Sequence, residues 1–512
     1  ESRQEKRPQL SDLRDSGCLT GGTLVPLADT GQRVPMRELC GRKDFYIWAL
    51  NEDTLKLEKA RVSNAFSTGT KPIYRLTTRL GRTIRATGNH RFRSFDGWKR
   101  LDEFAEGDRL ALPRYLPAKQ EQTLTNEQLA LIGHLIGDGC TLPRHAIQYT
   151  TREKDLAHIV SDLAMDVFGH EIEPNIKQER QWFQVYLSST RHHTHGVRNA
   201  VSEWFDEMGI FGLRSHEKFV PELIFTQPVN AIAVFLRHLW STDGCIRMRK
   251  TGSRQYPAVY YATSSNRLAY DVQSLLLCVG INARVKVVSQ GAKGRDQHHV
   301  IVSGYDDLET FVTVIGTVGA YKLESLREIE RYLSEKVGNT NRDVIPATIW
   351  REYVVPAMQV EGMTGRQMQA TINQPYCGTS LYKQNVSRTR AAVVAEAVNS
   401  LELTKLAESD IYWDEIVSIE PDGEEEVFDL TVPIHHNFVA NDIVVHNSIE
   451  QDADIVMFIY RDEYYNPDTT DRPGIAEINV AKHRNGPTAS IDLYWNGELA
   501  SFSNLQRQEV QL

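Results

Sequence analysis

Two short stretches of the chain combine a nucleophilic side chain with groups that can activate it. Gly17 precedes Cys18, whose thiol is the best nucleophile among uncharged side chains and follows an unhindered glycine carbonyl. Much later, His446-Asn447-Ser448 places an amide able to attack its own carbonyl between an imidazole and a hydroxyl. Taken singly, each pattern is more often an ordinary turn or strand end than a reactive site.

A third stretch lies between these two. Thr87-Gly88-Asn89-His90 follows a strand-like run, and its hydroxyl, amide and imidazole can together polarise a nearby peptide bond. The plain alternative is a β turn whose side chains hydrogen-bond to the backbone, which is the commoner use of such residues. Only the three stretches in combination favour chemistry.

The combination resembles the splicing blocks of inteins, which have the Hint fold. The resemblance rests on Cys18–Thr23, Arg85–His90, Val427–Val432 and His436–Asn441, the last of which leads to His446-Asn447. It implies a self-excising segment that needs no cofactor, because every step is an acyl transfer among side chains. The implied site residues are Cys18, Thr87, Asn89, His90, His436, His446, Asn447 and Ser448, together with Asp429, a carboxylate that steers the two transfers.

The implied mechanism has three steps. Cys18 attacks the Gly17 carbonyl, while the Thr87-Gly88-Asn89-His90 stretch holds and protonates the departing amide. Ser448 then attacks the thioester and forms a branched ester. Finally Asn447 cyclises with the help of two histidines, which frees the segment from Cys18 to Asn447 and leaves Gly17 joined to Ser448.

A block of mixed helix and strand lies inside this segment. Two apolar helical stretches in it end in Asp-Gly, at Leu131–Gly139 and Leu236–Gly244. One such helix is ordinary core, but the pair resembles the two LAGLIDADG motifs of homing endonucleases. The resemblance implies that Asp138 and Asp243 meet on adjacent helices and hold Mg²⁺ over the phosphates of double-stranded DNA, with Lys218 assisting cleavage.

The second motif departs from the family pattern. Gly133 and Gly137 suit close helix packing in the first motif, but His238 and Thr242 stand at the equivalent places of the second. This departure leaves both the close packing and the nuclease activity open. Lys286 is a weaker candidate for an assisting lysine.

Other features of the block have a plain explanation beside a functional one. His192-His193-Thr194-His195 suits an exposed polar loop better than a metal site. Arg247–Arg254 suits phosphate contact or a solvated β ribbon equally. Met363–Met368 and Lys383–Arg390 suit a DNA-contacting helical piece, although a solvated face is the commoner use of such charge.

Removing residues 18–447 restores a continuous sequence, SDLRDSG followed by SIEQDADIVMFIYRDEYY. It resembles the C-terminal part of DnaB-type replicative helicases, ATP-driven homo-hexameric rings on single-stranded DNA. The resemblance implies that Gln451, Lys482 and Arg484 lie near nucleotide, and that the complete spliced helicase uses ATP and Mg²⁺. The chain holds no GxxxxGKS/T loop, so it cannot cradle ATP phosphates by itself.

The composition of the chain restricts the class of protein to which it can belong. The 512 residues carry a formal net charge of −9, which argues against a uniformly basic DNA-coating surface. Six scattered cysteines form no CxxC pair and no disulfide framework, which favours a reducing, cytoplasmic setting. There is no apolar run long enough to span a membrane. Because the chain begins with Glu1, we expect the true N-terminus to be missing.

We therefore expect a multi-domain protein. The fold class is an all-β Hint splicing domain that is split in sequence, an α/β LAGLIDADG endonuclease domain, and a flanking fragment of an α/β RecA-like helicase domain. The expected boundaries are 1–17 for the first flank, 18–117 and 401–447 for the splicing domain, 118–400 for the endonuclease with a possible extra DNA-contacting segment at 342–400, and 448–512 for the second flank.

Local patterns place the elements that must position these residues. Short β segments are expected at Phe45–Leu50, Pro72–Thr77 and Thr83–Thr87, and again at Ile416–Ile419, Val427–Val432, Asn437–Val439 and Ile443–Val445. Thr125 and Gln128 form a plausible capping box at the start of the first apolar helix. In the second flank, strands are expected at Ile455–Tyr460, Ile475–Ala481 and Ser490–Trp495.

Two alternatives remain open from sequence. One is a stand-alone site-specific DNA endonuclease with β flanks, which leaves unexplained why the helicase-like sequence resumes directly after His446-Asn447. The other is a helicase whose insertion no longer splices or no longer cuts DNA.

Overall fold

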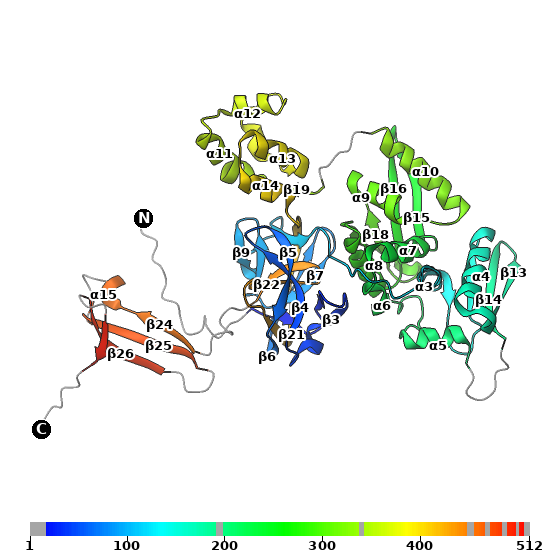
Figure 1. Cartoon of the computed structure of the whole chain (residues 1–512), viewed down its shortest axis with the longest axis horizontal. Coiled ribbons are helices and arrows are strands. Elements are labelled where there is room, and N and C mark those ends of the chain that lie inside the picture. Colours follow the sequence, from blue (N-terminus) through cyan, green and yellow to red (C-terminus); the bar gives the residue numbers. More distant parts are fainter. Residues whose placement is uncertain are drawn as a thin grey trace, which may run out of the picture.

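The computed structural model describes residues 17–190, 198–336, 342–447, 455–465, 470, 472–483, 489–497 and 501–505. Among the expected functional residues, Ser448, Gln451 and Arg484 lie outside this range, as does the cluster at 192–195; of Lys482 only the backbone is described. Figure 1 shows four parts: a central β module, a larger module of helices and sheets, a small helical module, and a C-terminal sheet.

The β module comprises residues 17–113 and 411–447. Its main sheet has the order β1-β7-β6-β21-β10-β8-β23-β22, with β9 beside β8 and a further pairing of β1 with β21. The elements are β1 (Leu19–Thr20), β2 (Leu24–Pro26), β3 (Arg33–Pro35), α2 (Met36–Leu39), β4 (Phe45–Asn51), β5 (Lys56–Val62), β6 (Asn64–Thr78), β7 (Thr83–Ala86), β8 (Arg91–Ser94), β9 (Gly97–Arg100), β10 (Arg109–Pro113), β21 (Ile411–Thr431), β22 (Asn437–Ala440) and β23 (Ile443–His446).

Strand β21 joins the two sequence halves of this module. It pairs antiparallel with β10 along its first residues and with β6 along most of its length. Inward-facing apolar side chains from both halves, such as Leu76, Ile84, Phe92 and Phe438, form one buried core. The β segments expected from alternation are confirmed, although Thr87 lies just beyond β7. A module divided by some 300 residues of chain is thus reassembled as one sheet.

The second module, residues 126–334, is built from two copies of one unit and is called the two-repeat module. Each unit runs helix, strand, strand, helix, strand, strand, and the two four-stranded sheets share one strand order, β11-β12-β14-β13 and β15-β16-β18-β17. The units are α3 (Asn126–Asp138), β11 (Gly139–Cys140), β12 (Gln148–Thr151), α4 (Lys154–Phe168), β13 (Ile172–Glu179) and β14 (Trp182–Ser189), then α7 (Val229–Trp240), β15 (Gly244–Thr251), β16 (Arg254–Thr263), α8 (Asn266–Cys278), β17 (Arg284–Val288) and β18 (Gln297–Val302).

This duplication is visible in the fold although the sequence shows no repeat of fixed period. Helices α5 (Ala200–Glu207), α6 (Glu222–Phe225), α9 (Tyr305–Thr310) and α10 (Ala320–Ser334) complete the module. Helix α3 begins at the expected capping box, in which Thr125 accepts from the backbone of Gln128 and the Gln128 side chain accepts from Thr125. Its side chains are buried nearly all round, as are those of α7.

The helical module consists of α11 (Val355–Val360), α12 (Gly365–Thr371), α13 (Arg388–Ala397) and α14 (Leu401–Glu408). Its apolar side chains share a core with the β module, where Trp350 and Leu403 pack in one cluster with Phe95 and Trp413. We expected the β module to resume at residue 401, but α14 occupies that stretch and β21 begins only at Ile411. The segment 383–390 is not one helix, since it spans a 3₁₀ turn, a short strand and the start of α13.

The C-terminal sheet has the order β24-β25-β26-β27, formed by β24 (Ile455–Tyr460), β25 (Ile475–His483), β26 (Ala489–Asn496) and β27 (Ser501–Asn504). The three strands expected in this flank are therefore confirmed. Within the described part of the chain, no helix is long and apolar enough to cross a membrane.

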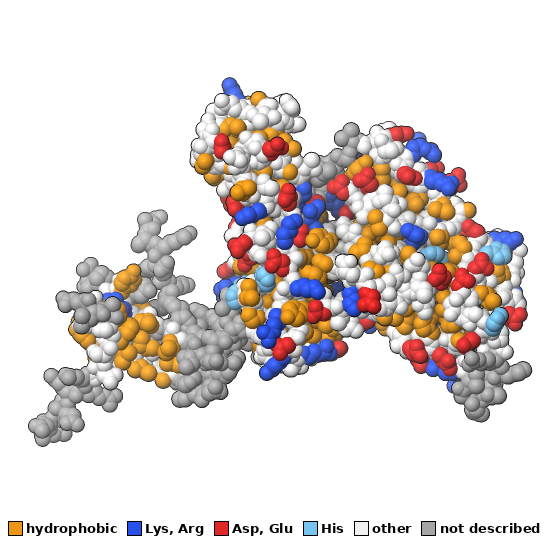
Figure 2. Space-filling model, viewed as in Figure 1, with side chains coloured by type: hydrophobic (Ala, Val, Ile, Leu, Met, Phe, Trp, Pro, Cys, Tyr) orange, Lys and Arg blue, Asp and Glu red, His pale blue; other side chains and the backbone are white. Residues whose placement is uncertain are grey.

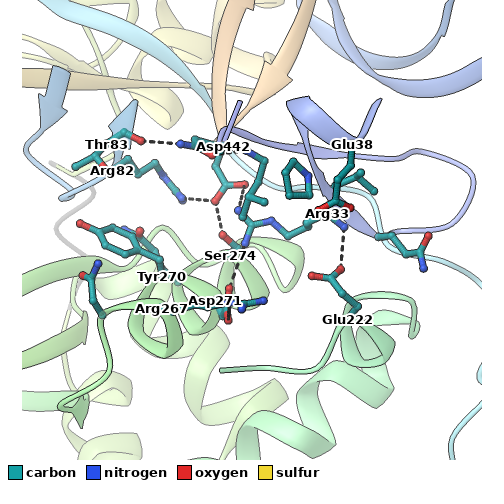
Figure 3. Close-up of a pocket in the computed structure, with 18 of the residues that line it drawn as sticks. Arg33, Glu38, Arg82, Thr83, Glu222, Arg267, Tyr270, Asp271, Ser274 and Asp442 are labelled. Atoms are coloured by element: carbon teal, nitrogen blue, oxygen red, sulfur yellow. Dashed lines mark hydrogen bonds and ion pairs between the residues drawn. The ribbon is translucent and has the colours of Figure 1, made fainter. Parts of the chain in front are cut away.

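A buried ionic network joins the β module to helix α8 of the two-repeat module (Figure 3). Asp442, in the turn between β22 and β23, accepts from Arg82 Nη1 at 2.6 Å and from Ser274 of α8. Arg33 lies 3.8 Å from Asp442 and 3.7 Å from Asp271 of α8. Burial disfavours the charged carboxylate, but the two guanidiniums hold the pKa of Asp442 below its ordinary value. The two modules therefore meet through compensated charges at the turn that leads into β23.

Candidate functional site

The backbone around Cys18 is fixed by two neighbouring strands. Leu19 pairs with Ala86 of β7 on one side and with Phe428 of β21 on the other. Thr87 accepts from the Cys18 amide through its hydroxyl at 2.9 Å and donates its own amide to the Cys18 carbonyl at 3.0 Å. The Thr87 hydroxyl then donates to Asn89 Oδ1 at 2.6 Å. The amide nitrogen that must depart from Gly17 is therefore held by a polarised hydroxyl.

His90 lies directly against the Gly17 end of this peptide. A Cβ atom on Gly17 would lie 2.4 Å from the His90 Cα, so only glycine fits this approach without a shift. The His90 ring is buried and packs edge-on against Phe92. Burial lowers the pKa of His90 to about 4, a shift that its approach to the Gly17 backbone only partly offsets. The imidazole is therefore neutral near pH 7.

The C-terminal junction is carried by the β22–β23 hairpin. Asn437 pairs with His446, and the Asn447 amide donates to the His436 carbonyl at 3.0 Å. The Asn447 side chain is fully buried, and among the described residues neither its oxygen nor its nitrogen has a hydrogen-bond partner. A buried amide without a hydrogen-bond partner raises the free energy of the folded state. Such an amide is typical of a group that gains its partner in a reaction.

The histidines beside this asparagine sit in different settings. Burial lowers the pKa of His446 to about 4, with Arg91 adding to the effect, and its ring packs edge-on against Trp98. His436 adopts a left-handed backbone with φ of +54°, and its buried Nδ1 has no partner in the described part of the chain. Both histidines lie at the open end of the hairpin, next to Asn447.

The two junctions converge around His90. Strand β23 pairs with β8 through Val445 and Phe92, so continuing this antiparallel register brings Asn447 opposite His90. A positive charge on His446 would also disfavour one on His90, so the two rings are near each other. Cys18 and Asn447, which are separated by more than 400 residues in sequence, thus flank one imidazole.

Asp429 is buried on β21, and its Oδ1 accepts from the amide of Leu430 at 2.8 Å. Val427, two residues earlier, packs against Cys18 in a small apolar cluster. The carboxylate therefore lies on the strand that borders the first junction.

A second set of functional candidates meets where α3 and α7 pack. A Cβ on Gly133 would lie 2.9 Å from the Leu239 nitrogen and from the Phe235 oxygen, and a Cβ on Gly137 would lie 2.0 Å from the hydroxyl of Thr242. The close approach that the second motif left open is therefore present, because glycines on one helix make room for larger residues on the other. His238 is also accommodated in the contact between α3 and α7, where its Nδ1 lies 3.0 Å from Nε2 of His134.

The carboxylates of Asp138 and Asp243 influence each other at the ends of these helices. Burial and the charge of Asp243 raise the pKa of Asp138 to about 7, and burial raises that of Asp243. Among the described residues, no cluster of three or more His, Cys, Asp or Glu side chains suits a metal ion. The two carboxylates fit a hard divalent cation nonetheless, because they lie close enough for the charge of Asp243 to raise the pKa of Asp138, and oxygen is the ligand such ions prefer.

Two buried lysines flank the carboxylates in matching positions. Lys218 donates to the carbonyls of Ile136 at 2.8 Å and Gly139 at 2.9 Å, at the end of α3. Lys322 of α10 donates to the carbonyls of Trp240 and Ser241 at 3.0 and 2.8 Å, at the end of α7. Burial lowers the pKa of both, that of Lys322 to about 8.

Lys322 was missed from sequence, where Lys286 was the second candidate. Lys286 instead lies on β17, paired with His299 of β18, and no hydrogen bond or ion pair among the described residues links it to either helix end. The spacing in sequence could have pointed to Lys322, because each of the two lysines lies about 80 residues after the helix end whose carbonyls it contacts. The surrounding sequences of the two lysines share no motif.

The comparisons with known proteins identify the family of the chain. The model of the intein splicing domain family matches residues 25–447. The chain belongs to this intein splicing domain family. The match runs across the β module, the inserted modules and the Asn447 junction.

Relatives that match nearly the whole chain include replicative helicases. The chain is 59% identical to the replicative DNA helicase DnaB of Nostoc sp. over 99% of its own length and 58% of that protein. It is likewise 59% identical to DnaB of Rhodothermus marinus, over 98% of the chain and 54% of the relative. The expected resemblance to DnaB-type helicases is confirmed, and the chain spans a little over half the length of these relatives.

Solved structures give weaker matches. A DnaB intein from Synechocystis sp. PCC 6803 is 20% identical with a TM-score of 0.27, covering 85% of this chain and all of that one. The homing endonuclease I-DmoI is 15% identical with a TM-score of 0.27, covering 37% of this chain and 95% of that one. Scores this low carry no argument.

The C-terminal sheet differs from the rest of the molecule in the kind of side chains that it exposes. On the face in Figure 2, charged side chains of both signs are interspersed over the β module and the two-repeat module, whereas apolar side chains gather on the C-terminal sheet. Its exposed apolar residues include Met457, Ile459, Ile491, Tyr494 and Phe502. An open apolar sheet face of this kind is typical of a surface that packs against something else.

Proposed function

We propose that the segment from Cys18 to Asn447 excises itself and joins Gly17 to Ser448. The observation that carries the proposal is the convergence of both junctions on the buried His90 ring, which lies against Gly17 and, by the register of β8 and β23, opposite Asn447. A site that must cut one chain at two distant peptide bonds needs this proximity.

The first transfer takes place at the Gly17–Cys18 peptide. The Cys18 sulfur attacks the Gly17 carbonyl, while the Thr87 hydroxyl, braced by Asn89, holds the departing nitrogen. His90 rests neutral, so it can take up the proton that the Cys18 thiol gives up and pass it to that nitrogen as the bond breaks, which leaves the imidazole neutral again.

The later transfers take place at the other junction. Ser448 attacks the thioester, with Asp429 steering the two steps from β21. Asn447 then attacks its own carbonyl through its unpaired side-chain amide, assisted by His446 and His436. The ester between Gly17 and the Ser448 side chain then rearranges to a peptide bond, which joins the two flanks. All steps use side chains alone, so no cofactor takes part.

The intact mass of the purified precursor after incubation tests this proposal. The wild type should yield the excised segment and the joined flanks. Cys18→Ala should retain the first junction and still release the C-terminal flank, and Asn447→Ala should retain the second junction. A wild type that stays at full length under reducing, neutral conditions would leave a helicase with a permanent insertion.

We further propose that the two-repeat module cuts double-stranded DNA at a specific site. The observation that favours it is the paired arrangement of Asp138 and Asp243 at the ends of α3 and α7, with one buried lysine over each end. Bound Mg²⁺ would activate water and stabilise the departing phosphate oxygen. The two carboxylates would hold the ion, and the lysines would fix the helix ends and offset the negative charge of the phosphates.

Cleavage of a duplex that encodes the joined flanks tests this second function. The wild type should cut it with Mg²⁺, and Asp138→Asn/Asp243→Asn should not. The same duplex with an insertion at the junction is the matched control, because an insertion divides the target. An inactive wild type would indicate a module that has kept its fold and lost its activity.

The flanks, once joined, would form part of an ATP-driven DnaB-type helicase that acts as a homo-hexamer on single-stranded DNA. Identity to DnaB proteins on both sides of the insertion supports this, as does the apolar face of the C-terminal sheet. In that helicase, the bound nucleotide would lie near Gln451, Lys482 and Arg484. The test is the rate of ATP hydrolysis by the full-length protein before and after excision. Equal rates in both forms would argue against a role of the joined flanks in ATP hydrolysis.

A further inference from the structure

We propose that Thr68 and Lys71, two residues of β6 outside the recognised splicing blocks, activate the Cys18 thiol for the first acyl transfer. The inference rests on the self-excision proposed above and adds two groups to that site.

Both side chains contact the reacting sulfur. Thr68 Oγ1 lies 3.0 Å from Cys18 Sγ, and Lys71 Nζ lies 3.7 Å from the same atom. Cys18 is fully buried, and a thiol must lose its proton to become a strong nucleophile. Burial disfavours a thiolate unless hydrogen bonds and an opposite charge compensate for the lost water. A hydroxyl and an ammonium group supply these two compensations.

A β-bulge brings Thr68 to the sulfur. In the pairing of β6 with β21, Ser67 lies opposite Phe428 and Gly69 lies opposite Val427, so Thr68 is the extra residue. Gly69 has φ of +88°, a conformation that glycine adopts without strain. Bulges re-aim a side chain and are frequent beside active sites. This bulge, one of three irregularities in the pairing of β6 with β21, is therefore the one that brings a side chain to the Cys18 sulfur.

The Thr68 hydroxyl has two possible acceptors for its single proton. It lies 3.2 Å from the Val427 carbonyl as well as 3.0 Å from the sulfur. While Cys18 is a thiol, its S–H donates to Thr68, whose own proton goes to Val427. When Cys18 is a thiolate, the hydroxyl turns and donates to sulfur, beside the N–H of Lys71. The same pair therefore accommodates both states.

The transfer itself is an isomerisation and needs no further reactant. The bond from Cys18 sulfur to the Gly17 carbonyl carbon forms, and the bond from that carbon to the Cys18 nitrogen breaks. The thiol proton ends on the released Cys18 amine. Lys71 and Thr68 stabilise the sulfur anion during this exchange and are themselves unchanged.

Other charged or titratable groups on the bordering elements are already engaged. Glu425 of β21 pairs with Arg85, and Asp429 accepts from a backbone amide. His90 is neutral near pH 7 because burial lowers its pKa to about 4. Lys71 is therefore the positive charge that the described contacts bring to the sulfur.

The first transfer is isolated in an Asn447→Ala/Ser448→Ala precursor, in which dithiothreitol releases residues 1–17 from the thioester. The rate of release is measured by mass from pH 6 to pH 9. Lys71→Met and Thr68→Val test the proposal, Lys71→Arg and Thr68→Ser retain the charge and the hydroxyl, and Lys59→Met is the matched control at an exposed lysine of β5.

We expect Lys71→Met to slow release about tenfold at pH 7, as loss of a neighbouring opposite charge predicts, with the difference shrinking toward pH 9. Thr68→Val should slow release similarly, and the two conservative variants should recover most of the rate. Cleavage after Asn447 in a Cys18→Ala background should not change.

Two outcomes would overturn the proposal: Lys71→Met and Thr68→Val with the pH profile of Lys59→Met, or equal slowing of both junctions, which would indicate a merely structural role. If the starting precursor releases nothing with dithiothreitol, the self-excision proposal itself fails.

Discussion

Asp138→Asn should stabilise the two-repeat module at alkaline pH. Burial and Asp243 raise the pKa of Asp138 from 3.8 to about 7, so the folded state keeps a proton that the unfolded state loses near pH 4. Between these values the unfolded state binds fewer protons, and stability must fall as pH rises. The raised pKa corresponds to about 4 kcal/mol. Because the side chain is partly exposed, we expect about 2–4 kcal/mol.

Hydrogen exchange of the α3 amides measures this effect in a Cys18→Ala/Asn447→Ala precursor kept in EDTA. Asp138→Asn should raise protection about 30- to 1000-fold at pH 8 relative to the parent, and very little at pH 4. Asp166→Asn, an exposed carboxylate on α4, is the matched control and should change neither. Mg²⁺ should protect the parent at pH 8 but not Asp138→Asn/Asp243→Asn. Equal protection of parent and Asp138→Asn at pH 8 would refute the electrostatic reasoning.

Three further variants test other parts of the structure. Gly133→Ala should cost about 1–3 kcal/mol in urea unfolding, because its Cβ would meet backbone atoms of α7 that cannot give way; unchanged stability would show that the helices pack less closely. Asp442→Asn, which suits the backbone φ of +59°, should cost about 3–5 kcal/mol, because the buried Arg82 loses its 2.6 Å carboxylate partner and Arg33 keeps only Asp271. The exposed Asp29→Asn should cost far less, and similar losses would contradict the buried network. Lys322→Met should lower DNA cleavage about 100-fold without unfolding the chain, whereas Lys286→Met should not; the reverse order would return Lys286 to the site.

The candidate splicing residues could be picked out from the sequence because the chemistry proposed for them demands particular side chains. A thiol after glycine, an asparagine between a histidine and a hydroxyl, and a Thr-x-Asn-His stretch are few enough in combination to be recognised without structure. Strands such as β4 and β7 followed from alternation, and the start of α3 followed from its capping box. In each case the decisive information is local in sequence.

The residues that were missed depend on distant contacts. Lys322 reaches the end of α7 only because α10 folds back over it, and Thr68 reaches Cys18 only through a bulge in a long strand. The close packing of α3 and α7 was left open because His238 and Thr242 are larger than glycine, although glycines on one helix suffice. Helix α14 was assigned to the β module because nothing in its sequence shows which core its apolar side chains join.

The most direct test of self-excision is the sequence of the new junction. Tryptic digestion of the incubated wild-type precursor should yield a peptide in which Asp15-Ser16-Gly17 runs directly into Ser448 and continues to Arg461. Tandem mass spectrometry should find an ordinary peptide bond between Gly17 and Ser448, and the peptide should be absent from Cys18→Ala. Only peptides that still contain Gly17-Cys18 and Asn447-Ser448, in a folded and fully incubated protein, would contradict the account.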